Sequence, residues 1–295
     1  AAIAVFTSTD PTPYKITMPA ADVIVDSTFK ATDFKVTCVT GGNGNVFGPT
    51  SGTANYNTTV ALTIKPDAGY ELDTLEIKGD KTSTIYTPAA DNSSFTMPAE
   101  DVTVKATFKV ANLAVKVNAT GGTVTLDHTD SLYKINDPVS AALKPDKGME
   151  IDTSKIKLEE DNNGTKNNVT SDPTYALTPS ANPVTFKMGG YPVELTVDFV
   201  KSVYDVSEGT DPNGTVTVNP PGKYSFGDKV TFICKPGSGY SLKTVKIIRD
   251  SDSKVVATYD AVKGTYTPTL EPDITEFDDT HFTMPAYEVT VQPSF

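Results

Sequence analysis

The chain has 295 residues and a formal net charge of −12, and charged residues make up 21% of it. An acidic surface repels both the phosphate backbone of nucleic acids and anionic lipid headgroups, so we expect neither as a partner. No stretch is long and apolar enough for a membrane-spanning helix, so direct insertion into a membrane is not expected. Hydrophobic residues make up 38% of the chain, which is enough for compact cores.

The chain begins with a block that returns three more times. It reads YKITMPAADVIVDSTF at 14–29, FTMPAEDVTVKATF at 95–108, VTFKMGGYPVELTVDF at 184–199 and HFTMPAYEVTVQPSF at 281–295. We call this block the closing signature. Its copies recur at intervals of roughly 80 to 100 residues, a period that is typical of tandem small domains. The repeat therefore argues against one large catalytic core.

Four segments follow from this period. We expect residues 1–30 to be the C-terminal remnant of a preceding module, and the modules themselves to span 31–109, 110–201 and 202–295. A remnant of two strands cannot bury its own apolar face, so it folds back on a neighbour or the rest of its module has been removed. Donation of a strand from residues 1–30 to another molecule, which would make the chain a polymer subunit, is an alternative.

Each closing signature predicts a strand, a tight turn and a final strand. Val102, Val104 and Phe108 alternate with polar residues, which is the period-two pattern of a half-buried strand. The preceding Phe95 and Met97 also point to one face. The proline that follows them cannot continue a strand ladder, so it marks the turn.

A second recurring block lies upstream and contains a Lys-Pro-x-x-Gly turn. It occupies Val60–Leu72, Val139–Ile151 and Val230–Leu242. We expect its glycines to supply a positive φ that other residues resist. These glycines are Gly69, Gly148 and Gly239.

A third turn, rich in glycine, occurs at 41–44, 121–122 and 213–214. We expect it to join the first two strands of each module as a hairpin. Each module then has about six strands and no convincing helical period, so the predicted fold class is all-β. Connections such as Lys109–Ala111 are too short for flexible linkers, and we therefore expect an elongated, semi-rigid rod.

The two cysteines, Cys38 and Cys234, fall in different modules, so we expect them to be free thiols. Cys234 occupies a position that Ile64 and Leu143 fill in the other copies, which predicts a buried core thiol of low reactivity. Small secreted domains often need disulfides. Modules that fold without them fit a bacterial exported protein better than an animal one.

The sequences FTMPAEDVTVKATF and KPDAGYELDTLEIKG, together with the glycine-rich turn, resemble the divergent internalin B-repeat family of bacterial surface repeats. The resemblance covers nearly the whole chain, as three tandem copies and a partial one. It implies small β-grasp-like or immunoglobulin-like modules that serve as stalk or adhesin segments, at the bacterial cell surface or secreted. The chain departs from the family in having no tryptophan, and in having Met188–Pro192 in place of the MPAxD turn.

No pattern in the chain predicts catalysis, which needs an activated nucleophile or paired acid and base groups. The two histidines, His128 and His281, have no recurring partner, and no HExxH, Walker or GxSxG pattern occurs. We therefore expect no enzyme activity and no organic cofactor.

Acidic residues in one inserted loop are the candidates for a metal site. Asp273, Glu276, Asp278 and Asp279 offer the oxygen ligands that calcium prefers, but they lack the alternating spacing and closing glutamate of an EF-hand. An ordinary solvated loop is the alternative, and we favour it.

These observations predict a non-enzymatic spacer or stalk segment of an exported bacterial surface protein, with other modules of that protein as its partners. An adhesin or glycan-binding module is the alternative. Its binding surface would be the inserted loops at 159–183 and 250–280, where the modules differ in length, and its partner would be a host protein or glycan.

Overall fold

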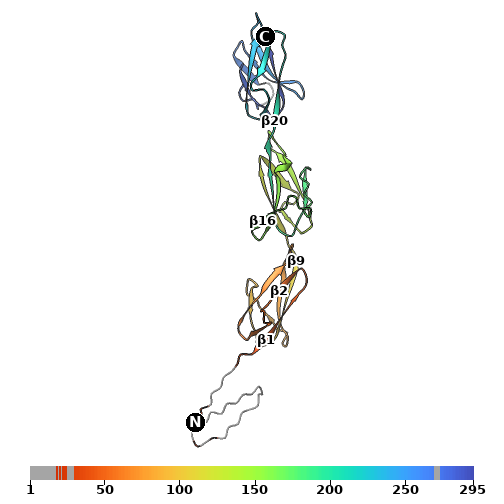
Figure 1. Ribbon diagram of the computed structural model, residues 1–295, viewed down its shortest axis with the longest axis vertical. Helices are drawn as coiled ribbons and strands as arrows, with labels where there is room; N and C mark the ends of the chain where they lie inside the picture. Colours follow the sequence, from red (N-terminus) through yellow and green to blue (C-terminus); the bar gives the residue numbers. More distant parts are fainter. Residues whose placement is uncertain (1–17, 19, 21, 25–29, 269–272) are drawn as a thin grey trace. The chain divides into compact units, whose positions relative to one another are not determined.

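The computed structural model describes residues 18, 20, 22–24, 30–268 and 273–295 (Figure 1). Within these residues every regular element is a β-strand, apart from one 3-10 turn at Thr153–Lys155, so the all-β prediction is confirmed. No helix in this described part is long and apolar enough to cross a membrane. The predicted remnant at 1–30 lies almost wholly outside the described residues, and its Met18 is 67% exposed.

The chain divides into two compact units. Unit 1 takes the described residues up to Val39 together with Val46–Thr63 and Leu75–Lys105, and unit 2 takes Thr40–Asn45, Ile64–Thr74 and Ala106–Phe295. The module boundaries that the repeats indicate stay a prediction.

Nine strands lie between Asp33 and Val110. They are β1 (Asp33–Thr40), β2 (Gly44–Phe47), β3 (Thr53–Asn55), β4 (Thr59–Ala61), β5 (Thr63–Pro66), β6 (Tyr70–Gly79), β7 (Ile85–Tyr86), β8 (Ser94–Thr96) and β9 (Val102–Val110). Their sheets have the orders β3-β1-β9-β6-β7, β2-β5 and β4-β8. The strands outnumber the expected six because short edge segments such as β3 and β7 pair as well.

The next stretch of unit 2 contains a five-stranded sheet of order β12-β10-β18-β15-β16 and a three-stranded sheet of order β11-β13-β17. Strands β14 and β19 form a separate two-stranded pair in the same stretch. The strands are β10 (Leu113–Thr120), β11 (Gly122–Leu126), β12 (Leu132–Tyr133), β13 (Pro138–Pro145), β14 (Met149–Glu150), β15 (Ile156–Asn162), β16 (Thr165–Asn168), β17 (Val184–Lys187), β18 (Val193–Asp198) and β19 (Val200–Lys201).

The last stretch of unit 2 repeats this plan. Its sheets have the orders β22-β20-β28-β24-β25-β26 and β21-β23-β27. The strands are β20 (Val203–Glu208), β21 (Gly214–Val218), β22 (Lys223–Ser225), β23 (Lys229–Pro236), β24 (Thr244–Arg249), β25 (Lys254–Asp260), β26 (Thr265–Pro268), β27 (His281–Thr283) and β28 (Val289–Ser294).

Each stretch of unit 2 encloses a hydrophobic core between its two sheets. In the first stretch, Val115 and Leu195 come from the five-stranded sheet, and Ala141 and Phe186 come from the three-stranded sheet. In the second stretch, a separate cluster runs from Val216 to Val291. Two facing sheets, with no helix across either face in the described residues, make a sandwich, so the immunoglobulin-like alternative fits better than the β-grasp.

The final strand of the closing signature lies inside the larger sheet. Strand β18 is parallel to β10, from Val115 opposite Val193 to Thr120 opposite Asp198, and antiparallel to β15 on its other side. Strand β28 lies in the same way between β20 and β24. The valines and leucine on one face of β18 are at most 2% exposed, which confirms the predicted alternation.

The glycine-rich turn does not make the hairpin that the sequence predicts. Strand β10 pairs with β12 and β18, whereas β11 pairs with β13 in the other sheet. The turn therefore carries the chain from one sheet to the other. Glycine is needed there for space, because a Cβ at Gly122 would lie 2.6 Å from the ring of Phe199, and a Cβ at Gly214 would lie 2.5 Å from the ring of Phe295.

In unit 1 a glutamate holds the turn of the closing signature. Glu100 is 5% exposed, and its carboxylate accepts hydrogen bonds from the backbone N–H of Lys81 at 2.9 Å, from the N–H and hydroxyl of Thr82 at 3.0 and 2.5 Å, and from the Tyr86 hydroxyl at 2.6 Å. The Thr82 hydroxyl, followed by that of Tyr86, lowers the pKa of Glu100 to about 2. Carboxylates stabilised by several donors stay ionised in this way.

We expect Glu100→Gln to lower the melting temperature by roughly 5 °C at neutral pH. The N–H groups of the new amide would face the N–H and hydroxyl groups that donate to the carboxylate in the parent chain. The carboxyl titrates at about 4.3 in the unfolded chain and at about 2 in the folded chain. Its contribution is therefore complete above the unfolded value and is lost as pH falls through the folded one. Thermal melts at pH 7, 4.5 and 2.5 measure this, and the variant should show less acid destabilisation.

The exposed Glu76 provides the matched control for this change. Glu76→Gln removes the same charge and should leave the melting temperature within about a degree, as expected for a surface substitution. Equal effects of the two substitutions would show that the Glu100 hydrogen bonds do not stabilise the turn.

Candidate functional site

The three Lys-Pro-x-x-Gly turns share one backbone geometry. We call them the glycine turns and name each by its glycine, Gly69, Gly148 or Gly239. The φ angles of these glycines are 84°, 76° and 84°, which confirms the predicted positive φ. In each turn the residue after the glycine donates its backbone N–H to the carbonyl three residues back, at 3.0 to 3.1 Å.

The Gly148 turn contacts a segment that lies far along the chain within unit 2. Its carbonyl accepts a hydrogen bond of 2.9 Å from the backbone N–H of Ser202, the residue between β19 and β20. Phe226, in the connection between β22 and β23, packs on the glycine so closely that a Cβ there would lie 2.5 Å from the Phe226 Cβ. Gly148 itself is buried. The glycine is thus required both by its φ and by its neighbour.

Lys147 adds two charged contacts to this turn. Its ammonium lies 5.6 Å from the centre of the Phe226 ring, a cation–π distance. The same ammonium forms an ion pair with Asp273, whose side chain is 9% exposed. The Asp273 carboxylate is buried, so little solvent can stabilise its charge. The half-exposed Lys147 neutralises that charge.

The Gly69 turn makes the same kinds of contact, also within unit 2. Its carbonyl accepts from the backbone N–H of Ala111 at 2.9 Å, and its own N–H donates to the carbonyl of Gly190 at 2.8 Å. A Cβ at Gly69 would lie 2.8 Å from the Ile135 side chain. Ile135 lies between β12 and β13, as Phe226 lies between β22 and β23.

These contacts explain why the middle closing signature has glycines where the other copies have proline and alanine. A Cβ at Gly190 would lie 2.5 Å from the Ala68 Cβ, next to the Gly69 turn. A Cβ at Gly189 would collide with the hydroxyl of Tyr175, which donates to Glu160. Gly189 and Gly190 are therefore set by close packing on both sides of the turn.

The calcium candidates do not gather at one point. Asp273 pairs with Lys147, whereas Asp278 accepts from the backbone N–H of Thr280 at 2.7 Å and of His281 at 2.8 Å. The Glu276 carboxylate lies 3.6 Å from Nε2 of His281, and Asp279 is exposed. Among the described residues no group of three or more His, Cys, Asp or Glu side chains is placed to hold a metal ion. A calcium site there stays a prediction.

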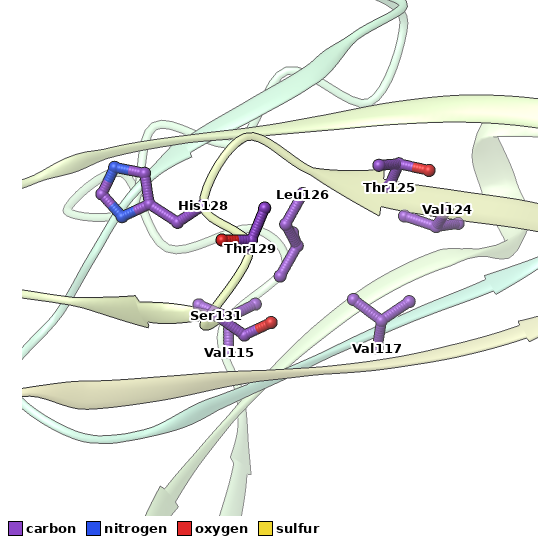
Figure 2. A pocket seen from close by; sticks show the side chains of 8 residues that line it. All are labelled: Val115, Val117, Val124, Thr125, Leu126, His128, Thr129 and Ser131. Atoms are coloured by element: carbon purple, nitrogen blue, oxygen red, sulfur yellow. The ribbon is translucent and has the colours of Figure 1, made fainter.

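A shallow hollow lies at the open edge of the sandwich between β10 and β11. Aliphatic and hydroxyl side chains line it, with His128 at its rim, as Figure 2 shows. The His128 ring points away from Val117 and Val124 in Figure 2, stacks on Tyr133 at 4.3 Å, and has Nδ1 2.9 Å from the carbonyl of Leu132. The imidazole is thus engaged in fixing its own turn.

The two cysteines are free, as predicted. Cys234 is partly buried and packs against the second core cluster, so it is less enclosed than the sequence suggested. Burial, followed by the charge of Asp279, raises the pKa of Cys234 to about 11. A thiol with this pKa is almost wholly protonated at neutral pH and is a poor nucleophile.

Sequence reasoning missed the apolar residues that cover the glycine turns. Ile135 and Phe226 each stand four residues before the buried valine that opens the next strand pattern, at Val139 and Val230. Tyr56 holds the same position in the first copy. An apolar residue repeated at one offset inside an otherwise polar turn is the signal that could have shown them.

Comparisons with known proteins find a family for part of the chain and a distant likeness to solved structures. Residues 34–112 match the model of the divergent InlB B-repeat domain. No curated protein matches the chain. The crystal structure of the N-terminal four Ig domains of Dscam1 isoform 8.4 aligns at 10% identity over 90% of this chain and 73% of that chain, with a TM-score of 0.12.

The glycine turns predict a difference between two identical substitutions. Gly239→Ala should lower the free energy of unfolding by about 1–2 kcal/mol, because alanine resists the positive φ. No steric clash adds to this cost, since nothing lies within 4 Å of a Cβ at this position. Gly148→Ala should cost about 1–3 kcal/mol more, because its Cβ also collides with Phe226. Urea unfolding followed by amide hydrogen exchange reports the two regions separately. Equal losses would show that Phe226 does not constrain Gly148.

Proposed function

Because residues 34–112 match the model of the divergent InlB B-repeat domain, we propose that the chain is a non-enzymatic spacer segment of an exported bacterial surface protein. Its work in this proposal is mechanical: the repeats, with the limits 31–109, 110–201 and 202–295, act as a spacer, and the repeats 110–201 and 202–295 are joined without a flexible linker. Its partners are then the neighbouring repeats of the same protein, outside the cell.

The observation that carries this proposal is the set of contacts at the Gly148 turn. The connection between β19 and β20 is the single residue Ser202, which is 7% exposed and whose N–H is bonded to the Gly148 carbonyl. Phe226 and the ion pair of Lys147 with Asp273 add packing on the same side. A hinge at Ser202 would have to break a buried backbone hydrogen bond, so this connection does not act as a flexible linker.

The inserted segments support a spacer better than a glycan-binding surface. They extend the sheets, as the hairpin β15–β16 and the added strands β25 and β26. The aromatic side chains of the second insertion pack inward: Phe277 is 7% exposed and lies 5.7 Å from Tyr266 and 6.0 Å from Tyr259, ring centre to centre. Rings used in this core are not free to stack on sugars.

A spacer of this kind should keep a fixed distance between its repeats. Pulsed electron paramagnetic resonance measures that distance between spin labels at Lys187→Cys and Lys246→Cys, which are both exposed. The native Cys38 and Cys234 are replaced by alanine. We expect one narrow distance distribution. Inserting Gly-Ser-Gly-Ser between Lys201 and Ser202 should broaden it severalfold.

The same four residues inserted between Val262 and Lys263, in the exposed turn joining β25 to β26, serve as the control and should leave the distribution narrow. A broad distribution in the parent chain would overturn the spacer proposal. Specific binding on a glycan array that is lost on replacing Val262 and Lys263 by serine would favour the adhesin alternative.

A further inference from the structure

We propose that the exposed face at the Gly239 turn is a docking surface for a further repeat attached directly after Phe295. The occupant would place an apolar turn residue on Gly239 and donate one backbone N–H to its carbonyl. This inference rests on the proposed function and adds to it the position and chemistry of the next contact.

The Gly239 turn is built like the two turns that are occupied. Its φ is 84°, the N–H of Tyr240 bonds to the carbonyl of Gly237 at 3.1 Å, and the N–H of Gly237 bonds to Asn213 at 2.7 Å. The Gly69 and Gly148 turns have the corresponding bonds. The backbone at Gly239 is therefore already in the conformation that accepts a neighbour.

Exposure separates this turn from the other two. Gly69 and Gly148 are buried, whereas Gly239 is exposed, and a Cβ at Gly239 would meet nothing within 4 Å. The next residue, Tyr240, is 52% exposed, whereas its counterparts Tyr70 and Met149 are half-buried. The described residues offer no backbone donor to the Gly239 carbonyl.

The chemistry of the occupant follows from the two filled turns. In both, the donated N–H belongs to the third residue after the phenylalanine that ends the closing signature: Ala111 follows Phe108, and Ser202 follows Phe199. In both, an apolar side chain, Ile135 or Phe226, covers the glycine. A repeat that starts after Phe295 in the same register would present both groups.

The chain itself contains a segment with these features. Thr32 is the third residue after Phe29, the phenylalanine that ends the first closing signature. Tyr56 holds the position of Ile135 and Phe226, and its side chain is 60% exposed in unit 1. Residues 30–109 placed directly after Phe295 would thus bring Thr32 and Tyr56 to the Gly239 turn.

A tether is needed because the contact is small. One backbone hydrogen bond and one apolar side chain contribute too little to offset the loss of free rotation and translation on association. A connection of two residues raises the effective concentration enough for such a contact to form. The surface therefore suits a repeat in the same chain better than a second copy in solution.

The test is a chain in which residues 30–109 follow Phe295 of the full sequence, again with the native cysteines replaced by alanine. Spin labels at Lys246→Cys and at Lys78→Cys of the appended copy report the new contact, since both positions are exposed. We expect a narrow distance distribution, which Tyr56→Ser in the appended copy broadens severalfold. Tyr56→Ser in the first copy is the matched control and should change nothing.

Two outcomes would overturn the proposal. One is a distribution as broad as that of a chain with Gly-Ser-Gly-Ser inserted after Phe295. The other is a narrow distribution that Tyr56→Ser in the appended copy does not alter. The Lys187 and Lys246 label pair separates this failure from failure of the spacer proposal, because that pair stays narrow if only the new contact is absent.

Sedimentation of the unextended chain tests the remaining occupant. We expect a monomer at all concentrations. Self-association that Tyr56→Ser abolishes would assign the Gly239 face to a second copy and would overturn docking by a tethered repeat.

Discussion

Each sandwich in unit 2 depends on one strand, the final strand of its closing signature, being inserted between two others. Strand β18 separates β10 from β15, and β28 separates β20 from β24. Strands β10 and β15 are not hydrogen-bonded to each other, and neither are β20 and β24, so the strand between them holds each sheet together. The residues of β18 that face inward are also among the least exposed of the core. The closing signature is therefore repeated with so little change because it completes both the sheet and the hydrophobic core.

Three glycines of unit 2 are required because another residue packs directly against them. Phe199 lies over Gly122, Phe226 over Gly148, and Ala68 against Gly190. In each case a methyl group would occupy space that a side chain distant in sequence already fills. Glycine at these positions thus records a tertiary contact, and its conformational freedom is a second requirement at Gly148 alone of the three.

The sequence predicts those features that depend on neighbouring residues. Alternation over β18 and positive φ at the glycine turns follow from local sterics, and the structure has both. The glycine-rich turn at 121–122 misled, because the same residues can close a hairpin or carry the chain between sheets, and only strand partners distinguish the two. The pairing of Asp273 with Lys147 had no local signal at all.

The parallel pairing of β10 with β18 has a consequence for load. The two strands begin and end the stretch 113–198, and six residue pairs join them side by side. Tension applied through the two ends of this stretch pulls the strands past each other along their length. All the hydrogen bonds between them then resist together, whereas a hairpin pulled at its open end would unzip one bond at a time. Stretching single molecules would register this as a high force peak for the stretch 113–198, so a segment that is placed under tension would resist unfolding.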